Sequence, residues 1–150
     1  MSDLDDIPTS SEMRIGEVAA RTGLTARTIR YYEEVGLLAA DAERAKGQHR
    51  HYDEADVDQL RLIHTLCILL GTSLDDIQRL VRPELAQVVS DRRWDRIETL
   101  AERLNVVETA LATVQGLLAL VRSRRAELER LEEELELRLG VIESRPVVGA

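Results

Sequence analysis

The stretch from Ala19 to Tyr32 constrains the fold of this chain most strongly, because it has the pattern of two short helices joined by a tight turn. Gly23 can adopt the positive φ that such a turn needs, and Ala19 is small enough to let two helices pack closely. Thr25 is a preferred N-cap for the second helix, and Ile29 returns an apolar side chain to a shared core. The spacing therefore predicts a helix-turn-helix.

Five side chains in and around the first turns of the second helix can project away from this core. They are Thr25, Arg27, Thr28, Arg30 and Tyr31. In helix-turn-helix proteins this part of the second helix enters the major groove, where such side chains contact phosphates and base edges. We predict that these residues bind DNA and that Arg27 contacts a base. The alternative is an ordinary solvated helix face, with Arg30 paired to Glu33 or Glu34.

The formal net charge of -8 excludes a broadly basic surface, so any contact with nucleic acid requires a local basic patch. Two such patches are visible in the sequence. No acidic residue occurs from Arg21 to Tyr32, and Arg44, Lys46 and Arg50 are followed by no acidic residue before Asp53. Both patches fall in the part of the chain that carries the helix-turn-helix pattern.

The second patch belongs to a segment that is typical of a small hairpin, or wing. Leu37-Leu38 is expected to start a short strand that leads into residues 41–51, where a glycine and several charges occur. Lys46, Arg50 and Tyr52 are expected to hold phosphates beside the major groove. The alternative is a flexible basic loop with Tyr52 in the core.

Two more helices are expected before a boundary at Arg82-Pro83. Asp53 can cap a helix from about Glu54 to Leu70, which has apolar residues at helical spacing. Ser73 can cap a fourth helix that ends near Val81, with two aspartates in its first turn. Leu and Val together with abundant Glu and Arg indicate a mainly α fold.

The second half of the chain is predicted to be one long helix, from Asp91 or Trp94 to about Leu139. Two apolar series recur at seven-residue intervals and form a heptad seam. The first contains Leu100, Val107, Val114, Val121, Leu128, Leu135 and Ile142, and the second contains Ile97, Leu104, Leu111, Leu118 and Leu139. Arg125 and Glu132 interrupt the second series. A lone helix would leave the seam in water, so we expect a homodimer.

The expected organisation has four parts. Residues 1–13 are acidic and form a disordered leader, and residues 14–82 form a winged helix-turn-helix domain. Residues 83–140 form a dimerisation coiled-coil helix, and residues 141–150 form a flexible tail. The start of the chain lacks the pattern of a signal peptide, and no apolar run approaches the roughly 20 residues that span a bilayer. We therefore expect a cytoplasmic protein without a membrane contact.

No catalytic or metal site is predicted. The candidate ligands are His49, His51, His64 and Cys67, but two of the histidines fall in the basic wing and no second thiol exists. The single cysteine falls in an apolar helix stripe, where a buried free cysteine is a common core residue. We expect no enzyme activity and no cofactor. Trp94, the only tryptophan, either packs at a helix junction or forms one wall of a small-molecule pocket.

Several segments of this chain match a known family in order. They are Ile15-Gly16-Glu17-Val18-Ala19, Thr25 to Glu33, Gly36-Leu37-Leu38, Arg50-His51-Tyr52 and Leu70 to Ile77. On these segments the chain, from Arg14 to about Val81, resembles the MerR family of bacterial transcription regulators. The resemblance implies a winged helix-turn-helix, a following helix pair and a long helix that pairs antiparallel in a dimer. It also implies a pseudo-palindromic operator that the dimer bends and untwists, with RNA polymerase as a further partner.

The sequence also departs from the family pattern. Gln48-His49 stands in the wing where Gly-Tyr is common, and Ala39-Ala40 replaces a proline often found after the recognition helix. The C-terminal region has no cysteine, which removes the thiol ligands of metal-sensing and redox-sensing members, and we expect no separate ligand-binding domain. The main alternative function is a coiled-coil interaction or scaffold protein that uses the helix-turn-helix to bind another protein.

Overall fold

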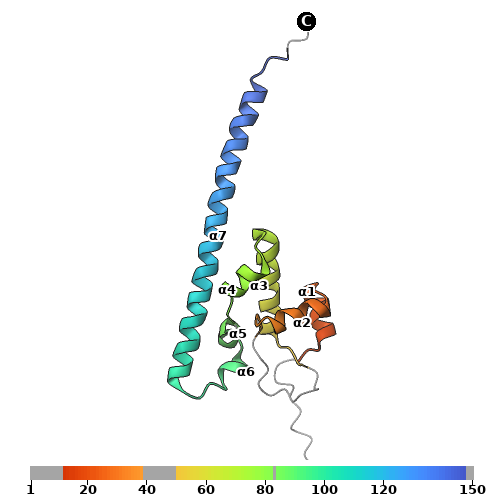
Figure 1. The fold of residues 1–150 in the computed structure, drawn as a ribbon, viewed down its shortest axis with the longest axis vertical. Helices are drawn as coiled ribbons and strands as arrows, with labels where there is room; N and C mark the ends of the chain where they lie inside the picture. Colours follow the sequence, from red (N-terminus) through yellow and green to blue (C-terminus); the bar gives the residue numbers. More distant parts are fainter. Residues whose placement is uncertain (1–11, 39–49, 83, 148–150) are drawn as a thin grey trace, which may run out of the picture. The chain divides into compact units, whose positions relative to one another are not determined.

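The computed structural model describes residues 12–38, 50–82 and 84–147, and the ordered elements in these ranges are helices. They are α1 (Ile15–Thr22), α2 (Ala26–Glu34), α3 (Glu54–Leu70), α4 (Leu74–Leu80), α5 (Glu84–Val89), α6 (Asp91–Trp94) and α7 (Leu100–Glu143). Figure 1 shows these elements in chain order. The mainly α fold is therefore confirmed. Most of the expected wing, including Lys46, lies outside the described residues.

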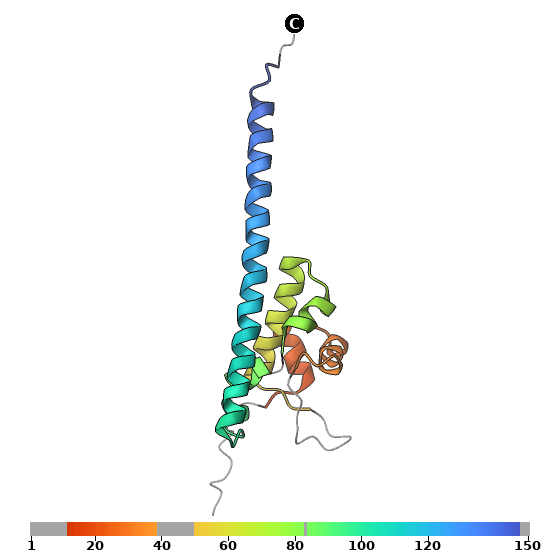
Figure 2. The ribbon, with the colours of Figure 1, turned by 60° about the vertical axis from the view of Figure 1, so that its left-hand side comes forward.

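The chain divides into two units, Met1–Val114 and Gln115–Ala150. The first unit contains α1 to α6 and the beginning of α7, and the second contains the rest of α7. Within the first unit α1 packs against α2 and α3, while α3 also packs against α4 and α5. Figure 2 shows the first four helices grouped together from a second direction.

The helix-turn-helix forms through the local chemistry that its sequence predicts. Gly23 ends α1 with a φ of 73°, a left-handed conformation that favours glycine. Thr25 then caps α2, because its hydroxyl oxygen accepts a hydrogen bond of 3.1 Å from the N–H of Thr28. Ile29 and Tyr32 are buried, so the inward face of α2 is fixed by packing.

The expected strand at Leu37-Leu38 is wrong, because these residues complete the end of α2 instead. Gly36 takes a φ of 78°, and its N–H donates to the carbonyl of Glu33 at 3.0 Å. The N–H of Leu37 donates to the carbonyl of Tyr32 at 2.9 Å, which gives the two-bond pattern of a Schellman motif. This bond uses the backbone donor that a strand would need, and both leucine side chains are buried.

Helices α3 and α4 begin at the predicted caps. Asp53 and Asp56 form a reciprocal capping box, in which each carboxylate accepts the other residue's backbone N–H, at 3.0 and 3.1 Å. The hydroxyl oxygen of Ser73 accepts from the N–H of Asp76 at 3.2 Å. Gly71 ends α3 in the left-handed conformation, as its place after the last apolar residue predicts.

The long helix starts later than predicted. Residues 84–94 form the two short helices α5 and α6, and α7 begins at Leu100. Thr99 and Glu102 cap α7 reciprocally, because each accepts the other's backbone N–H, at 3.2 and 3.4 Å. Ile97 therefore precedes the helix and does not continue the seam. At the other end α7 extends to Glu143, so the helix includes the first residues of the expected tail.

The core of the first unit is apolar and is drawn from distant parts of the sequence. Its fully buried members include Met13, Val18, Ile29, Leu37, Leu60, Ile63 and Ile77. Met13, which the sequence assigns to the leader, exchanges two backbone hydrogen bonds with Tyr52, at 2.8 and 2.9 Å. This antiparallel bridge ties the start of the domain to the residue that precedes the capping box of α3.

Helix α7 carries buried and exposed apolar side chains. In the first unit Val106 and Ala110 are buried, whereas the seam residues Leu104 and Leu111 are more than half exposed. From position 121 to 147 every residue is exposed in the single chain. Apart from the half-buried Val107, the heptad-seam side chains of α7 are thus exposed in the single chain.

The expectation that no apolar run could span a bilayer is wrong for α7. Its most apolar 18-residue window has a mean hydropathy of 1.6, which makes the helix long and apolar enough to cross a membrane by length and composition. One such helix is weak evidence for a membrane span. Polar side chains interrupt the most apolar part of α7, including Asn105, Glu108 and Gln115.

Candidate DNA-binding surface

Side chains that the sequence assigns to DNA contact lie together on the outward face of α2. Arg27 and Arg30 are exposed, and Tyr31 has 47% of its surface exposed. With Thr28 and Glu34 these residues line an open depression of 480 Å³. The opposite face of the same helix is buried, so α2 presents these side chains on a fixed support.

The first turn of α2 is ordered by two threonines. Thr25 caps the helix, and its hydroxyl also lies 2.8 Å from that of Thr28. Four backbone N–H groups are left without intrahelical partners at any helix start, and here one of them is satisfied by Thr25. The first turn carries no acidic residue, so the partial positive charge of the helix N-terminus is not neutralised by an acidic side chain of that turn. This end of α2 is suited to a phosphate.

Arg21 belongs to the first basic patch of the sequence but is engaged elsewhere. Its guanidinium forms a two-point contact with the carboxylate of Glu54 at the start of α3, with an Nη2 to Oε2 distance of 2.8 Å. This hydrogen bond raises the pKa of Arg21 and lowers the pKa of Glu54. The pair joins α1 to α3. Arg27 and Arg30 are the other two arginines of this basic patch, and both are exposed on α2.

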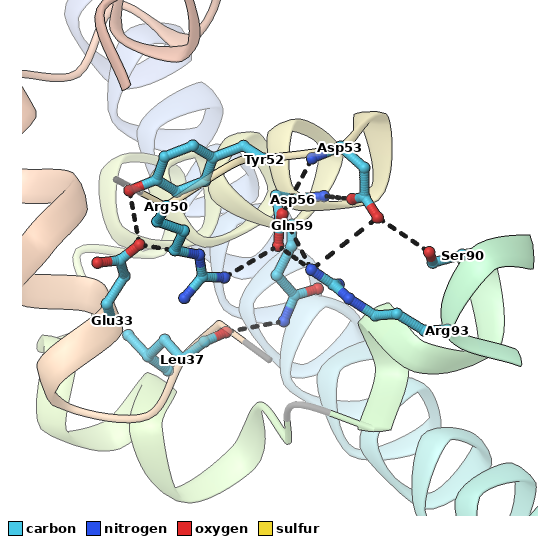
Figure 3. A network of polar contacts seen from close by, with 9 residues as sticks. All are labelled: Glu33, Leu37, Arg50, Tyr52, Asp53, Asp56, Gln59, Ser90 and Arg93. Atoms are coloured by element: carbon cyan, nitrogen blue, oxygen red, sulfur yellow. Dashed lines mark hydrogen bonds and ion pairs between the residues drawn. The ribbon is translucent and has the colours of Figure 1, made fainter. Parts of the chain in front are cut away.

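A second group of charged residues lies behind α2 and holds its C-terminal end (Figure 3). The hydroxyl of Tyr52 donates to the carboxylate of Glu33 at 2.6 Å, and Nε of Arg50 lies 3.1 Å from the same oxygen. The other end of the Arg50 guanidinium reaches Asp56 at 3.5 Å. Glu33 of α2 is thereby connected to the first turn of α3.

The same group continues to α5 and α6. Nη2 of Arg93, in α6, lies 2.9 and 3.0 Å from the two carboxylate oxygens of Asp56, whose side chain is completely buried. Ser90 donates to the carboxylate of Asp53 at 2.9 Å. We call Glu33, Arg50, Tyr52, Asp53, Asp56, Ser90 and Arg93 the polar network. Its members connect α2, α3 and the α5–α6 segment within the first unit.

The positions of Arg50 and Tyr52 differ from those expected for residues that hold phosphates. The Arg50 side chain is only 7% exposed, and Tyr52 is buried beneath it, with the guanidinium 5.1 Å from the ring centre. Burial and the hydrogen bond to Glu33 together raise the pKa of the Tyr52 hydroxyl. The sequence places both residues in the basic patch, but the structure gathers them with Glu33 and away from the exposed face of α2.

The remaining candidate residues lie apart from this surface. Among the described residues no group of three or more histidine, cysteine or acidic side chains has the arrangement of a metal site. Cys67 is partly buried, and this burial raises the pKa of its thiol. Trp94 lies at the junction before α7, where the guanidinium of Arg103 is 5.4 Å from the ring centre. Arg103 also donates to the carbonyl of Ile97 at 2.9 Å.

Sequence reasoning found the exposed residues of α2 but missed the polar network. The sequence identifies Asp53 as a helix cap but predicts no role for Asp56, Ser90 or Arg93. The Asp53-x-x-Asp56 pattern signals a capping box, yet nothing local shows that distant arginines share its carboxylates.

Two short helices joined at a left-handed glycine, with an exposed arginine-bearing second helix, define the helix-turn-helix class of proteins. The family model for MerR HTH family regulatory proteins matches residues 13–83. The HTH-type transcriptional regulator YfmP of Bacillus subtilis is 30% identical over 138 residues, which cover 83% of this chain and 98% of that protein. The chain belongs to the MerR family.

Two further similarities extend over most of the chain. The nodulation protein NolA of Bradyrhizobium sp. is 32% identical over 145 residues, which cover 93% of this chain. The match spans only 56% of that protein's length. The crystal structure of HiNmlR, a MerR family regulator lacking the sensor domain and bound to promoter DNA, is 27% identical. The similarity covers 89% of this chain and 91% of the HiNmlR chain, with a TM-score of 0.45.

Proposed function

We propose that this protein is a homodimeric transcription regulator of the cytoplasm that binds a specific site in double-stranded DNA. The observation that carries the proposal is the division of α2 into a buried face and an exposed face. Ile29 and Tyr32 anchor the helix, while Arg27 and Arg30 remain free of the ion pairs seen among the described residues. Family membership supports the same function.

The proposed contacts divide the site residues by role. Arg27 reads a base edge, and Thr25, Thr28, Arg30 and Tyr31 contact phosphates and neighbouring edges. Lys46 is proposed to hold a phosphate from the wing. We assign Arg50 and Tyr52 a positioning role, because both are buried against Glu33 at the end of α2.

A dimer supplies two copies of α2, related by a two-fold axis. The exposed seam of α7 supports pairing with a second copy, and the MerR resemblance implies that the paired helices run antiparallel. Two related helices fit a pseudo-palindromic operator whose half-sites lie on one side of the duplex. Bending and untwisting of the DNA between the half-sites, with recruitment of RNA polymerase, is the proposed route to activation.

Selection of bound sequences from a random DNA pool tests this function most broadly. We expect enrichment of an inverted repeat, with half-sites separated by about one helical turn or a multiple of it. Affinity for the selected duplex should fall steeply as the salt concentration rises, because binding releases counterions from phosphates. Failure to enrich any sequence, under conditions where the chain is folded, would contradict the proposal.

A further inference from the structure

We propose that Arg93 of α6 is a positioning residue for DNA reading, because its positive charge allows Arg50 to hold Glu33 at the end of α2. This inference rests on the proposed function and adds to it a residue outside the helix-turn-helix. A substitution in α6 is therefore expected to change the choice of DNA sequence, although no side chain of α6 is proposed to touch DNA.

Asp56 is the member of the polar network whose charge most needs a cation. Its side chain is completely buried, and a buried carboxylate is costly unless ion pairs and hydrogen bonds compensate it. Nη2 of Arg93 lies 2.9 and 3.0 Å from the two oxygens of Asp56, whereas Nη2 of Arg50 lies 3.5 Å from one of them (Figure 3). Arg93 therefore supplies the stronger, charge-assisted contacts.

Arg50 divides its guanidinium between two carboxylates. Its Nε lies 3.1 Å from an oxygen of Glu33, and its Nη2 makes the longer contact with Asp56. Without Arg93, Arg50 would be the one cation within 4 Å of Asp56 among the described residues. Attraction between charges is strong where water is excluded, so we expect the guanidinium of Arg50 to shift toward Asp56 and away from Glu33.

Glu33 connects this competition to the DNA-reading face. It lies in the last turn of α2, where its largely buried carboxylate accepts from the hydroxyl of Tyr52 at 2.6 Å and contacts Arg50. Glu33 follows Arg30 by three positions, a spacing at which a glutamate and an arginine can pair on a helix. Once it loses Arg50, Glu33 can draw the Arg30 side chain away from DNA.

The α5–α6 segment reaches the polar network through few atoms. Ser90 donates to Asp53 at 2.9 Å, and every ion pair of Arg93 with Asp53 and Asp56 uses Nη2. Nη1 of Arg93 is buried and has no hydrogen-bond partner among the described residues. One nitrogen atom thus carries the charged link between α6 and Asp56.

A comparison of two duplexes tests the role of Arg93. Fluorescence anisotropy of the full chain gives its affinities for the selected operator and for an unrelated duplex of equal length, at a temperature where circular dichroism shows each variant to be folded. Arg93→Gln should lower the ratio of the two affinities by about tenfold, as expected for the loss of a charged hydrogen bond. Arg82→Gln removes the same charge from an exposed position outside the polar network and should leave the ratio unchanged.

Two charge-matched double variants separate positioning from loss of stability. Asp56→Asn/Arg93→Gln removes the carboxylate that would attract Arg50, so the ratio should return to that of the original chain. Asp53→Asn/Arg93→Gln has the same net charge but keeps Asp56, so the ratio should stay low. Asparagine is a good helix cap and can accept the backbone hydrogen bond at either position. These two variants test the inference even if Arg93→Gln does not fold.

The outcomes separate this inference from the proposed function. An original chain that binds both duplexes equally would overturn the proposed function and the inference together. An original chain that prefers the operator, with the same preference in folded Arg93→Gln, would overturn the inference alone. Equal ratios in the two double variants would also overturn it, because Asp56 would then not be the residue through which Arg93 acts.

Discussion

The first unit and the C-terminal part of α7 differ in how they bury apolar surface. The first unit encloses residues such as Val18, Leu60 and Ile77 and adds the buried polar network. From position 121 onward α7 has no buried residue in the single chain, although leucine and valine recur at heptad spacing. One region is stabilised by contacts within the chain, whereas the other presents a seam that needs a second helix.

The DNA-binding unit and the pairing of two chains therefore depend on different kinds of interaction. The helix-turn-helix positions its side chains through caps, a left-handed glycine and contacts between distant residues. Helix α7 is ordered by capping and helix propensity, and its apolar side remains available for association. Substitutions in the two regions should therefore separate stability of the DNA-binding unit from dimerisation.

The largest effect is expected from a charge in the seam. Leu118→Glu removes an apolar contact twice per dimer and should weaken association by about 5 kcal/mol, or more than about 1,000-fold. Sedimentation over a range of concentrations measures this change. Ala119→Glu, at the exposed neighbouring position, is the matched control and should remain dimeric. Equal dissociation of both variants would show that the seam is not the dimer contact.

The next largest effect is expected from breaking the polar network. Asp56→Asn removes the charge that is shared by Arg50 and Arg93, so two largely buried guanidinium groups each lose one of their charged partners. We expect the free energy of unfolding of the first unit to fall by about 3 to 5 kcal/mol. Denaturant unfolding monitored by circular dichroism measures the loss.

Asp58→Asn provides the control for Asp56→Asn, because Asp58 is on the same helix but is exposed. Its contact with Arg61 has an N to O distance of 3.9 Å, and its removal should cost less than about 1 kcal/mol. Comparable losses in the two variants would contradict a special role for the buried carboxylate.

A smaller and more selective effect is expected on DNA. Arg27→Ala should lower the affinity for the selected operator by about 1 to 3 kcal/mol and relax discrimination at one base pair in each half-site. Fluorescence anisotropy with matched and single-base variant duplexes measures both changes. Arg79→Ala, at an exposed arginine of α4, is the control and should leave discrimination unchanged. Retained discrimination in Arg27→Ala would remove Arg27 from base readout.

The smallest effect is expected from the hydroxyl of Tyr52. Tyr52→Phe loses the hydrogen bond to Glu33 and should lower stability by about 1 kcal/mol at neutral pH. The folded state raises the pKa of this hydroxyl, so its contribution is complete below the ordinary tyrosine pKa of about 10 and is lost as the pH rises above it.

Thermal unfolding across alkaline pH measures the Tyr52 effect. The original chain should lose stability more steeply above about pH 10 than Tyr52→Phe does. Tyr31→Phe, at the exposed tyrosine of α2, should keep the steep dependence. Identical alkaline profiles for all three proteins would contradict the account of Tyr52.

Local chemistry made much of the fold predictable. Thr25, Asp53 and Ser73 each combine a short polar side chain with a following helical pattern, and each caps the expected helix. The heptad spacing that includes Ile97 predicts too early a start for α7, because the reciprocal cap of Thr99 and Glu102 begins the helix after Ile97. Leu37 was assigned to a strand because its role in closing α2 depends on backbone bonds that composition does not reveal.

The polar network lay beyond sequence reasoning for a different reason. Glu33, Asp56 and Arg93 are widely separated in the chain, and only the packing of α2, α3 and α6 brings them together. Arg50 has the same charge and sequence context whether it faces a phosphate or Glu33. The Arg50 side chain is buried in the structure, beside Glu33. The charge pattern of a basic segment does not show whether a side chain is buried.

In the proposed function, two exposed helices α2, joined by paired α7 helices, read one DNA site. The most direct test is the mass of the complex formed with a selected operator duplex, measured by sedimentation or native mass spectrometry. We predict two chains per duplex for the original protein, and loss of that complex for Leu118→Glu at concentrations where this variant is monomeric. A specific complex with one chain per duplex would contradict it.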